Sequence, residues 1–194
     1  MKNRILTSII FTVLLLTFGC STNKNPIITI ETEIGIIKVE LYKNKAPVTV
    51  NNFLNYVDNK MLNGGEFYRV VNTGNQPENN IKIDVIQGGI GWDDSLPRLE
   101  PIKHESTDKT KILHKRGTIS MARDMPGTAS SEFFICVFDE PELDYGGMRN
   151  PDGQGFAAFG KVIEGMHIVE QIHTMPDTNQ MLIMPVKILS VKCI

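Results

Sequence analysis

Residues 27 to 42, IITIETEIGIIKVELY, determine the class of fold that this 194-residue sequence encodes. Within this stretch, residues 37 to 41, IKVEL, alternate apolar with charged side chains, as expected for a β-strand with one buried face. Residues 33 to 35, EIG, interrupt the two β-prone halves and end in glycine. The stretch therefore predicts a β-hairpin, and hence an antiparallel sheet.

The rest of the chain extends this pattern. Two segments, residues 47 to 62 and 165 to 175, have apolar residues at helical spacing; the first begins at a proline and precedes Gly64. Many short strands with turn-rich connections and two helices predict a mainly β fold, a closed antiparallel barrel capped by the helices. The further strands are expected at residues 67 to 72, 84 to 88, 117 to 122, 132 to 138, 156 to 161 and 185 to 193.

The first residues have the layout of an export signal. Two basic residues precede an apolar run, residues 5 to 18, that is shorter than the roughly 20 residues of a membrane-spanning helix. Gly19 and Cys20 follow, and LTFGC resembles a bacterial lipobox. We expect a signal peptide over residues 1 to 19, lipidation of Cys20, a polar tether over residues 20 to 26 and membrane anchoring in the cell envelope or periplasm. Ordinary secretion is the alternative.

The remaining residues, 27 to 194, suit one domain with its own core. The formal net charge of -2 argues against a nucleic-acid partner, because phosphate binding needs a basic face. The four histidines form neither an H-E-x-x-H pair nor a cysteine-containing set, so no metal site is expected and the histidines are assigned surface or supporting positions. We expect a monomer.

Two cysteines remain besides Cys20. Export would permit a disulfide between Cys136 and Cys193. Cys136, however, lies in the apolar run FFICVF, which favours a buried thiol.

The predicted strand EFYRVVN, residues 66 to 72, carries a charge among apolar residues. Strict alternation of side chains would place Phe67, Arg69 and Val71 on one face, where an unpaired buried charge is very costly. One explanation is a salt bridge from Arg69 to Glu66. The other is that the charge has a function.

Several segments taken together point to that function. In sequence and in order they resemble the cyclophilin family of peptidyl-prolyl cis-trans isomerases, and they span residues 27 to 193. The segments are APVTVNNFLNYV, FYRVV, VIQGG, GTISMAR, SSEFFICV, ELD and FAAFGKVIEGMHIVEQI. The resemblance implies a closed eight-stranded antiparallel barrel with two capping helices and an outer groove. It also implies isomerisation of X-Pro bonds in exported or unfolded polypeptide clients, without a cofactor.

The resemblance also assigns residues. Arg69 corresponds to the family's catalytic arginine, and Gln87 is expected to orient it. As an X-Pro amide twists, its nitrogen becomes pyramidal and can accept a hydrogen bond, so a guanidinium beside it stabilises the twisted state selectively. Phe133 is expected in the core, because its neighbour Phe134 faces the other way. The residues expected to contact substrate are Val85, Met121, Ala122, Arg123, Glu132, Phe134, Leu143 and Phe156.

Four positions depart from the family's pattern. They are Asp84 for a usual phenylalanine, Glu132 for a glutamine, Glu142 for a tryptophan and Phe156 for a histidine. Asp84 or Glu132 could pair with Arg69, and Asp84 in a pocket wall would weaken binding of apolar residues beside proline and of cyclosporin-type macrocycles. A catalytically weak chaperone or binding module is therefore the alternative to an enzyme. Residues 91 to 111 and 144 to 155, longer than in small cyclophilins, are expected to shape access to the groove.

Overall fold

The computed structural model describes residues 25 to 91 and 96 to 194, so the expected signal peptide and Cys20 lie outside the described residues. Its helices are α1 (Pro47–Asp58), α2 (Thr107–Thr110) and α3 (Met166–His173), with single 3-10 turns η1 (Thr73–Asn75) and η2 (Pro141–Leu143). Its strands are β1 (Ile27–Thr32), β2 (Gly35–Leu41), β3 (Glu66–Val71), β4 (Val85–Gly89), β5 (Thr118–Met121), β6 (Phe133–Cys136), β7 (Ala157–Glu164), β8 (Asp177–Thr178) and β9 (Met181–Cys193).

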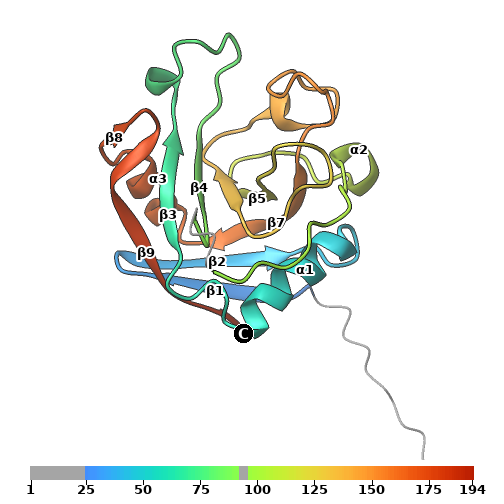
Figure 1. Ribbon diagram of the computed structural model, residues 1–194, viewed down its shortest axis with the longest axis vertical. Helices are drawn as coiled ribbons and strands as arrows, with labels where there is room; N and C mark the ends of the chain where they lie inside the picture. Colours follow the sequence, from blue (N-terminus) through green and yellow to red (C-terminus); the bar gives the residue numbers. More distant parts are fainter. Residues whose placement is uncertain (1–24, 92–95) are drawn as a thin grey trace, which may run out of the picture.

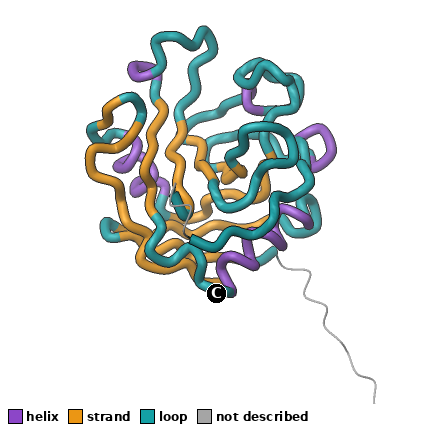
Figure 2. Tube along the Cα trace, in the orientation of Figure 1, coloured by secondary structure: helices purple, strands orange, loops and turns teal. Residues whose placement is uncertain are grey.

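The strands close into a barrel (Figure 1). Neighbouring strands follow the order β1-β2-β7-β5-β6-β4-β3-β9, and β1 also pairs with β9, so eight strands complete a ring. Every pairing is antiparallel, and β8 adds only a two-residue hairpin partner to β9. Long loops connect several of these strands (Figure 2). The predicted closed, eight-stranded antiparallel barrel is confirmed.

The two predicted helices are present, and both are shorter than predicted: α3 spans Met166–His173 rather than residues 165 to 175. Helix α1 ends at Asp58 rather than at residue 62, because Lys60 adopts a left-handed conformation with a φ of 57°. The amide of Lys60 then bonds to the carbonyl of Val57, and that of Met61 to the carbonyl of Tyr56, which is the Schellman pattern of helix termination. The short helix α2 was not predicted.

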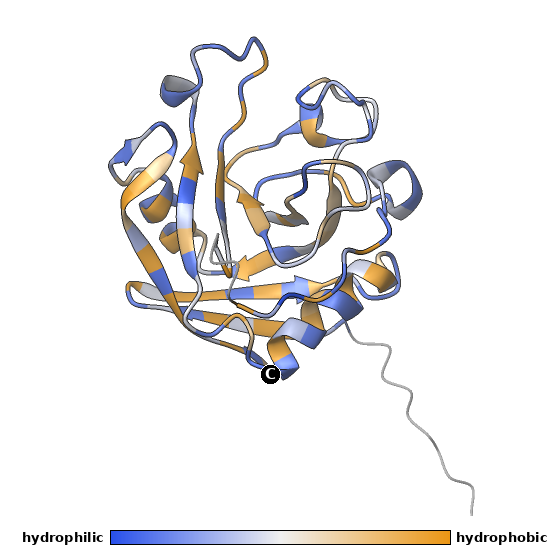
Figure 3. Ribbon diagram, viewed as in Figure 1, coloured by the Kyte–Doolittle hydropathy of each residue, from blue (hydrophilic) through white to orange (hydrophobic). Residues whose placement is uncertain are grey.

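The barrel interior is the main hydrophobic core. Phe53 of α1 reaches into it and contacts Phe133 edge-on at a centroid distance of 5.5 Å, while Phe67 contacts the same ring at 5.7 Å. All three rings are buried. Hydrophobic residues are interspersed with hydrophilic ones along the strands (Figure 3). This alternation lets each strand bury one face in the barrel and leaves the other face for other contacts.

A second, smaller apolar cluster lies outside the barrel core. Strand β6 divides its side chains between the two, with Phe133 in the barrel and Phe134 in the second cluster, so the expected core position of Phe133 is confirmed. The buried members of the second cluster are Val71, Ile83, Val85, Phe134, Cys136 and Leu143.

A β-bulge in β3 overturns one expectation. Phe67 pairs with Gly88 and Arg69 with Gln87, so Tyr68 is an extra residue on its strand. The predicted sharing of one face by Phe67 and Arg69 is therefore wrong: Phe67 lies in the barrel core, and Arg69 faces outward. Gly88 fits this crowded position because a Cβ there would lie 2.8 Å from the Phe67 ring and 2.7 Å from the Glu66 carbonyl.

Cys136 and Cys193 are both free thiols, so the structure contains no disulfide between them. Cys136 is fully buried, which confirms its interpretation as a buried thiol, whereas Cys193 is exposed. Burial raises the pKa of the Cys136 thiol. Among the described helices, none is both long enough and apolar enough to cross a membrane.

Candidate functional site

A cavity of about 740 Å³ lies over the second apolar cluster on the outside of the barrel. It is lined by every residue expected at the site except Met121. The side chain of Met121 is buried in the barrel core and does not line the cavity, so the expected contact of Met121 with substrate would come from its backbone. The expected residues that line the cavity are Arg69, Val85, Gln87, Ala122, Arg123, Glu132, Phe134, Leu143 and Phe156.

One part of the cavity is an apolar pocket. The rings of Phe134 and Phe156 meet edge-on, with centroids 5.4 Å apart, and Val85 and Leu143 contribute aliphatic walls. Phe134 and Leu143 line the cavity although only 5% and 1% of their surfaces are exposed to solvent. These walls suit a small, apolar ring such as that of proline.

A buried histidine supports the pocket from behind. The ring of His114 stacks on Phe134 at a centroid distance of 5.9 Å. Its Nδ1 lies 2.7 Å from Oδ1 of Asp144, and its Nε2 lies 2.9 Å from Oγ of Ser120. The carboxylate of Asp144 can only accept, so Nδ1 carries a proton and the ring orientation is fixed. His114 therefore occupies a supporting position, one of the two expected for the histidines.

Arg69 lies at the edge of this pocket and is held by two glutamines. Its Nη1 donates to Oε1 of Gln87 at 2.7 Å, and its Nη2 and Nε donate to Oε1 of Gln180 at 2.5 and 3.2 Å. Burial lowers the pKa of Arg69. Among the described residues no carboxylate forms an ion pair with it, so the alternatives in which Glu66, Asp84 or Glu132 pairs with Arg69 are wrong.

Gln180 was not expected at the site. It lies in the turn between β8 and β9, where Asn179 and Gln180 have φ values of 52° and 71°. Its side-chain Nε2 donates to the backbone carbonyl of Asn75 at 3.1 Å. The backbone carbonyl of Gln180 accepts from the backbone amide of Val70 at 2.9 Å. Asn179 comes before it, and asparagine tolerates the left-handed backbone conformation of such turns. Asn179 is therefore the residue from which this hairpin could have been predicted.

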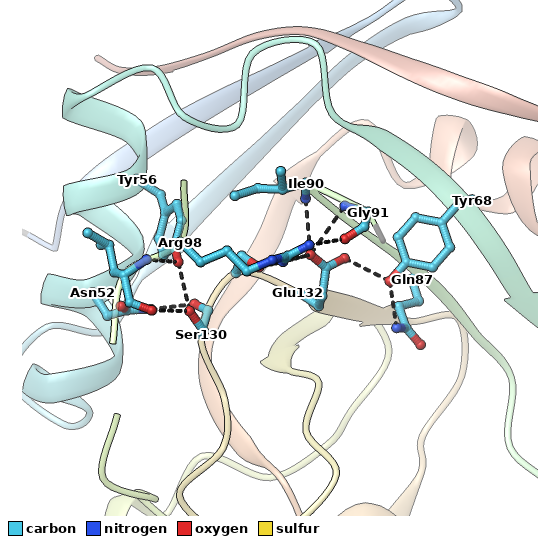
Figure 4. Close-up of polar contacts among 11 residues, drawn as sticks. Asn52, Tyr56, Tyr68, Gln87, Ile90, Gly91, Arg98, Ser130 and Glu132 are labelled. Atoms are coloured by element: carbon cyan, nitrogen blue, oxygen red, sulfur yellow. Dashed lines mark hydrogen bonds and ion pairs between the residues drawn. The ribbon is translucent and has the colours of Figure 1, made fainter. Parts of the chain in front are cut away.

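Glu132 is the centre of a second network beside Gln87 (Figure 4). The hydroxyl of Tyr68 donates to Oε2 of Glu132 at 2.7 Å and accepts from Nε2 of Gln87 at 2.9 Å. Oε1 of Glu132 accepts from the amides of Ile90 and Gly91, at 3.1 and 3.3 Å. Burial and the neighbouring Glu132 charge raise the pKa of Tyr68, which keeps its hydroxyl protonated.

Asp84 does not form a pocket wall. Its carboxylate lies 3.4 Å from Nε2 of His173, and its amide donates to Oε1 of Glu140 at 2.8 Å. The neighbours of Asp84 in sequence, Ile83 and Val85, line the cavity instead. The condition under which Asp84 would weaken binding, a place in the pocket wall, is therefore not met.

Both longer segments contribute to the cavity, as expected. Residues 98 to 101 line it from the first segment, and Arg149 and Asn150 from the second. The turn of the second segment also holds Arg123, whose Nη1 lies 2.8 Å from Oδ2 of Asp152 and whose guanidinium lies 5.0 Å from the centroid of Phe156. Within the described residues, no group of three or more His, Cys, Asp or Glu side chains is arranged to hold a metal ion.

Comparison with known proteins places these features in one family. Residues 27 to 193 match the family described as cyclophilin type peptidyl-prolyl cis-trans isomerase/CLD. The chain is 36% identical over 177 residues to a peptidyl-prolyl cis-trans isomerase of Acinetobacter baylyi, covering 87% of this chain and 85% of that protein. It is 35% identical over 149 residues to peptidyl-prolyl cis-trans isomerase B of Escherichia coli, covering 75% of this chain and 82% of that protein.

The fold agrees with a solved structure of the same family. A cyclophilin type peptidyl-prolyl cis-trans isomerase of Cryptosporidium parvum superposes with a TM-score of 0.70 at 22% sequence identity. The superposition covers 88% of this chain and 98% of that structure.

Proposed function

The chain belongs to the cyclophilin-type peptidyl-prolyl cis-trans isomerase family, and from this premise we propose that Arg69 and the apolar pocket beside it perform the catalysis. The activity of the family is rotation about X-Pro peptide bonds. The barrier to that rotation is about 18–20 kcal/mol, because resonance gives the C–N bond double-bond character. The residues of this chain must lower that barrier.

The pocket of Val85, Phe134, Leu143 and Phe156 seats the proline ring of the client. Its walls are fixed by the stack on His114 and by the edge-on contact between the two phenylalanines. The pocket holds the proline ring still while the residue before it rotates. The binding energy of the ring therefore keeps the X-Pro bond oriented toward Arg69.

Arg69 acts on the twisted amide. A guanidinium has five N–H donors, and the two glutamines engage three of them. Within residues 25 to 91 and 96 to 194, one N–H on each terminal nitrogen is therefore left for the client. One of these donates to the proline nitrogen only when that nitrogen is pyramidal. A donor that bonds the transition state and not the planar amide accelerates the reaction, and a dehydrated setting strengthens the contact.

Two side chains act through Arg69. Gln87 and Gln180 each present an oxygen to the guanidinium, and together they fix its plane at the edge of the pocket. The observation that carries the proposal is this arrangement: a half-buried arginine without a carboxylate partner among the described residues, oriented by two amides, at the rim of an apolar pocket.

The clients are exported or unfolded polypeptides that contain proline, and the protein works in the cell envelope, anchored through lipid on Cys20. The support for this location is the basic start, apolar run and LTFGC of residues 1 to 20. X-Pro isomerisation is slow enough to limit folding, so an isomerase in that compartment would speed a folding step of its clients.

The binding-module alternative rested on acids placed to pair with Arg69. Asp84 instead pairs with His173, and Glu132 bonds to Tyr68 and Arg98. Neither contacts Arg69, so no observation favours a loss of catalysis.

The direct test follows cis-to-trans conversion of a short X-Pro peptide with residues 21 to 194, which contain the whole barrel and its core. Replacing Arg69 with alanine should lower kcat/KM on the order of 100- to 1,000-fold, the usual cost of removing a donor that acts on the transition state. Arg69→Lys should restore little, because lysine lacks the planar fork. Arg116→Ala, which removes an exposed arginine paired with Glu170, is the control. Equal activity of Arg69→Ala and the unsubstituted protein would overturn the mechanism.

A further inference from the structure

Four arginines line the cavity, and they differ in their partners. Nη1 of Arg98 lies 3.3 Å from Oε1 of Glu132, and Nη1 of Arg123 lies 2.8 Å from Oδ2 of Asp152. Within the part of the chain that the structure describes, neither Arg69 nor Arg149 forms an ion pair. The catalytic proposal accounts for Arg69 but not for Arg149.

Arg149 is held in place by uncharged groups. Its Nη1 donates to Oε1 of Gln76 at 2.8 Å and to the carbonyl of Ile81 at 2.7 Å. Gln76 is only 1% exposed, and its own Nε2 donates to the carbonyls of Asn72 and Ile83. Both bonds of the Arg149 side chain leave from one nitrogen, so the N–H groups on Nε and Nη2 have no partner among the described residues. The guanidinium is therefore oriented but still able to donate.

Arg149 and Arg69 are anchored on the same loop, residues 72 to 83. Arg149 bonds to Gln76 and Ile81 of this loop, and Gln180, which holds Arg69, bonds to the carbonyl of Asn75. Burial, and then the charge of Arg69, lower the pKa of Arg149. Two partly dehydrated positive charges thus lie in one cavity.

Among the described residues, no nearby acid forms an ion pair with Arg69 or Arg149. Glu140 accepts the amide of Asp84, and the carboxylate of Glu142 accepts the amide of Met148 at 2.8 Å. Neither carboxylate forms an ion pair with Arg149. The charge of Glu140 opposes the lowering of the Arg149 pKa but forms no ion pair with Arg149. A partly dehydrated guanidinium without an ion-pair partner is unfavourable, and an incoming carboxylate that accepts from its oriented N–H groups relieves this cost.

We propose that Arg149 forms a subsite for a carboxylate side chain, so that the groove prefers client segments with Asp or Glu beside the proline. This inference rests on the proposed function, because the proline ring in the apolar pocket places its neighbours within the same cavity. The preference would appear mainly in KM, since the ion pair forms in the ground state and in the transition state alike.

The test uses two pairs of X-Pro peptides, each pair identical except for Glu or Gln directly before or directly after the proline. At low salt, the Glu peptide of at least one pair should have a kcat/KM about tenfold above that of the matching Gln peptide. This ratio corresponds to the free energy of one charge-assisted hydrogen bond. Arg149→Gln should bring this ratio close to one, and Arg149→Lys should restore part of it. Arg116→Gln, which removes a distant positive charge, should leave the ratio unchanged.

The two hypotheses fail differently. Equal kcat/KM for Glu and Gln peptides with the unsubstituted protein would overturn the subsite while upholding the isomerase. If neither peptide were isomerised, the proposed function would fail, and dissociation constants of the same peptides would still decide the subsite. A Glu preference that survives in Arg149→Gln would also overturn it.

Discussion

The hydroxyl of Tyr68 lies 2.7 Å from Oε2 of Glu132, and this contact sets the direction of the hydrogen bonds that reach Arg69. A carboxylate can only accept, so Tyr68 gives its single O–H to Glu132 and must accept from Nε2 of Gln87. The other end of the Gln87 amide, Oε1, then faces Arg69. The acid that departs from the family's pattern therefore supports the orientation of the arginine.

Replacing Glu132 with glutamine should leave the orientation of the Arg69 guanidinium less fixed. A glutamine can donate as well as accept, so Tyr68 and Gln87 would no longer be restricted to one arrangement. We expect kcat/KM to fall about three- to tenfold, the worth of roughly one oriented hydrogen bond. The Arg69 Nε–H signal in NMR spectra should broaden or shift. The control is Glu100→Gln, which removes an acid from the same cavity. An unchanged rate together with an unchanged Arg69 signal would contradict this account.

Gln180 should act through Arg69 rather than through the client. Gln180→Met keeps the length of the side chain but removes the oxygen that accepts from Nε and Nη2. We expect kcat to fall about tenfold with little change in KM, because the arginine loses its fixed plane. Gln180→Glu, which restores an acceptor, should recover part of the rate. Thr178→Ala in the same hairpin should have no effect; if it slows the enzyme as much as Gln180→Met does, the hairpin and not the amide is responsible.

Glu140 should make the protein less stable as the pH rises. Burial, opposed by the hydrogen bond from the Asp84 amide, raises the pKa of Glu140 from 4.5 to about 7. The folded state therefore holds this proton more tightly than the unfolded state does, so the free energy of unfolding falls between pH 4.5 and about pH 7. The fall attributable to this group is at most about 3 kcal/mol.

The measurement is urea unfolding at several pH values in that window. Glu140→Gln keeps an oxygen for the Asp84 amide and cannot titrate, so its stability should depend less on pH than that of the unsubstituted protein. Glu78→Gln removes an exposed acid instead and should retain the original slope. Parallel stability curves for Glu140→Gln and the unsubstituted protein would show that Glu140 does not titrate in this range.

The sequence predicted the barrel because the alternation of its strands is a local property. The position of the β-bulge at Tyr68 does not follow from the sequence of its own strand. Its register depends on Gly88 of the neighbouring strand, where the absence of a Cβ admits Phe67. Strict alternation therefore placed Phe67 and Arg69 on one face. The assignment of Arg69 to the groove came from the family resemblance instead, and Arg69 does line the cavity.

Contacts that join segments far apart in the chain were harder to predict than the residues of the quoted motifs. Gln180 lies 111 positions from Arg69 in the chain and reaches it only because β9 pairs with β3. Arg149 is in a loop without periodicity, and its contacts with Gln76 and Ile81 depend on how two loops pack. The same holds for Asp84, whose partner His173 comes from α3.

The barrel core and the groove should be separable by mutation, because Phe53 belongs to one apolar cluster and the pocket to the other. Phe53 is 1% exposed and lies between Phe133 and Phe159, at centroid distances of 5.5 and 5.1 Å. Truncating such a ring leaves a cavity that its neighbours fill only in part. Phe53→Ala should therefore lower the free energy of unfolding by about 3–5 kcal/mol, measured by urea denaturation.

The matched control is Val48→Ala on the same helix, whose side chain is 39% exposed and should cost less than about 0.5 kcal/mol. Below the unfolding transition, kcat/KM per folded molecule of Phe53→Ala should stay within about twofold of the unsubstituted value, because the second cluster and the Arg69 network keep their own contacts. A large loss of activity in protein that is still folded would show that packing in the barrel interior sets the geometry of the groove.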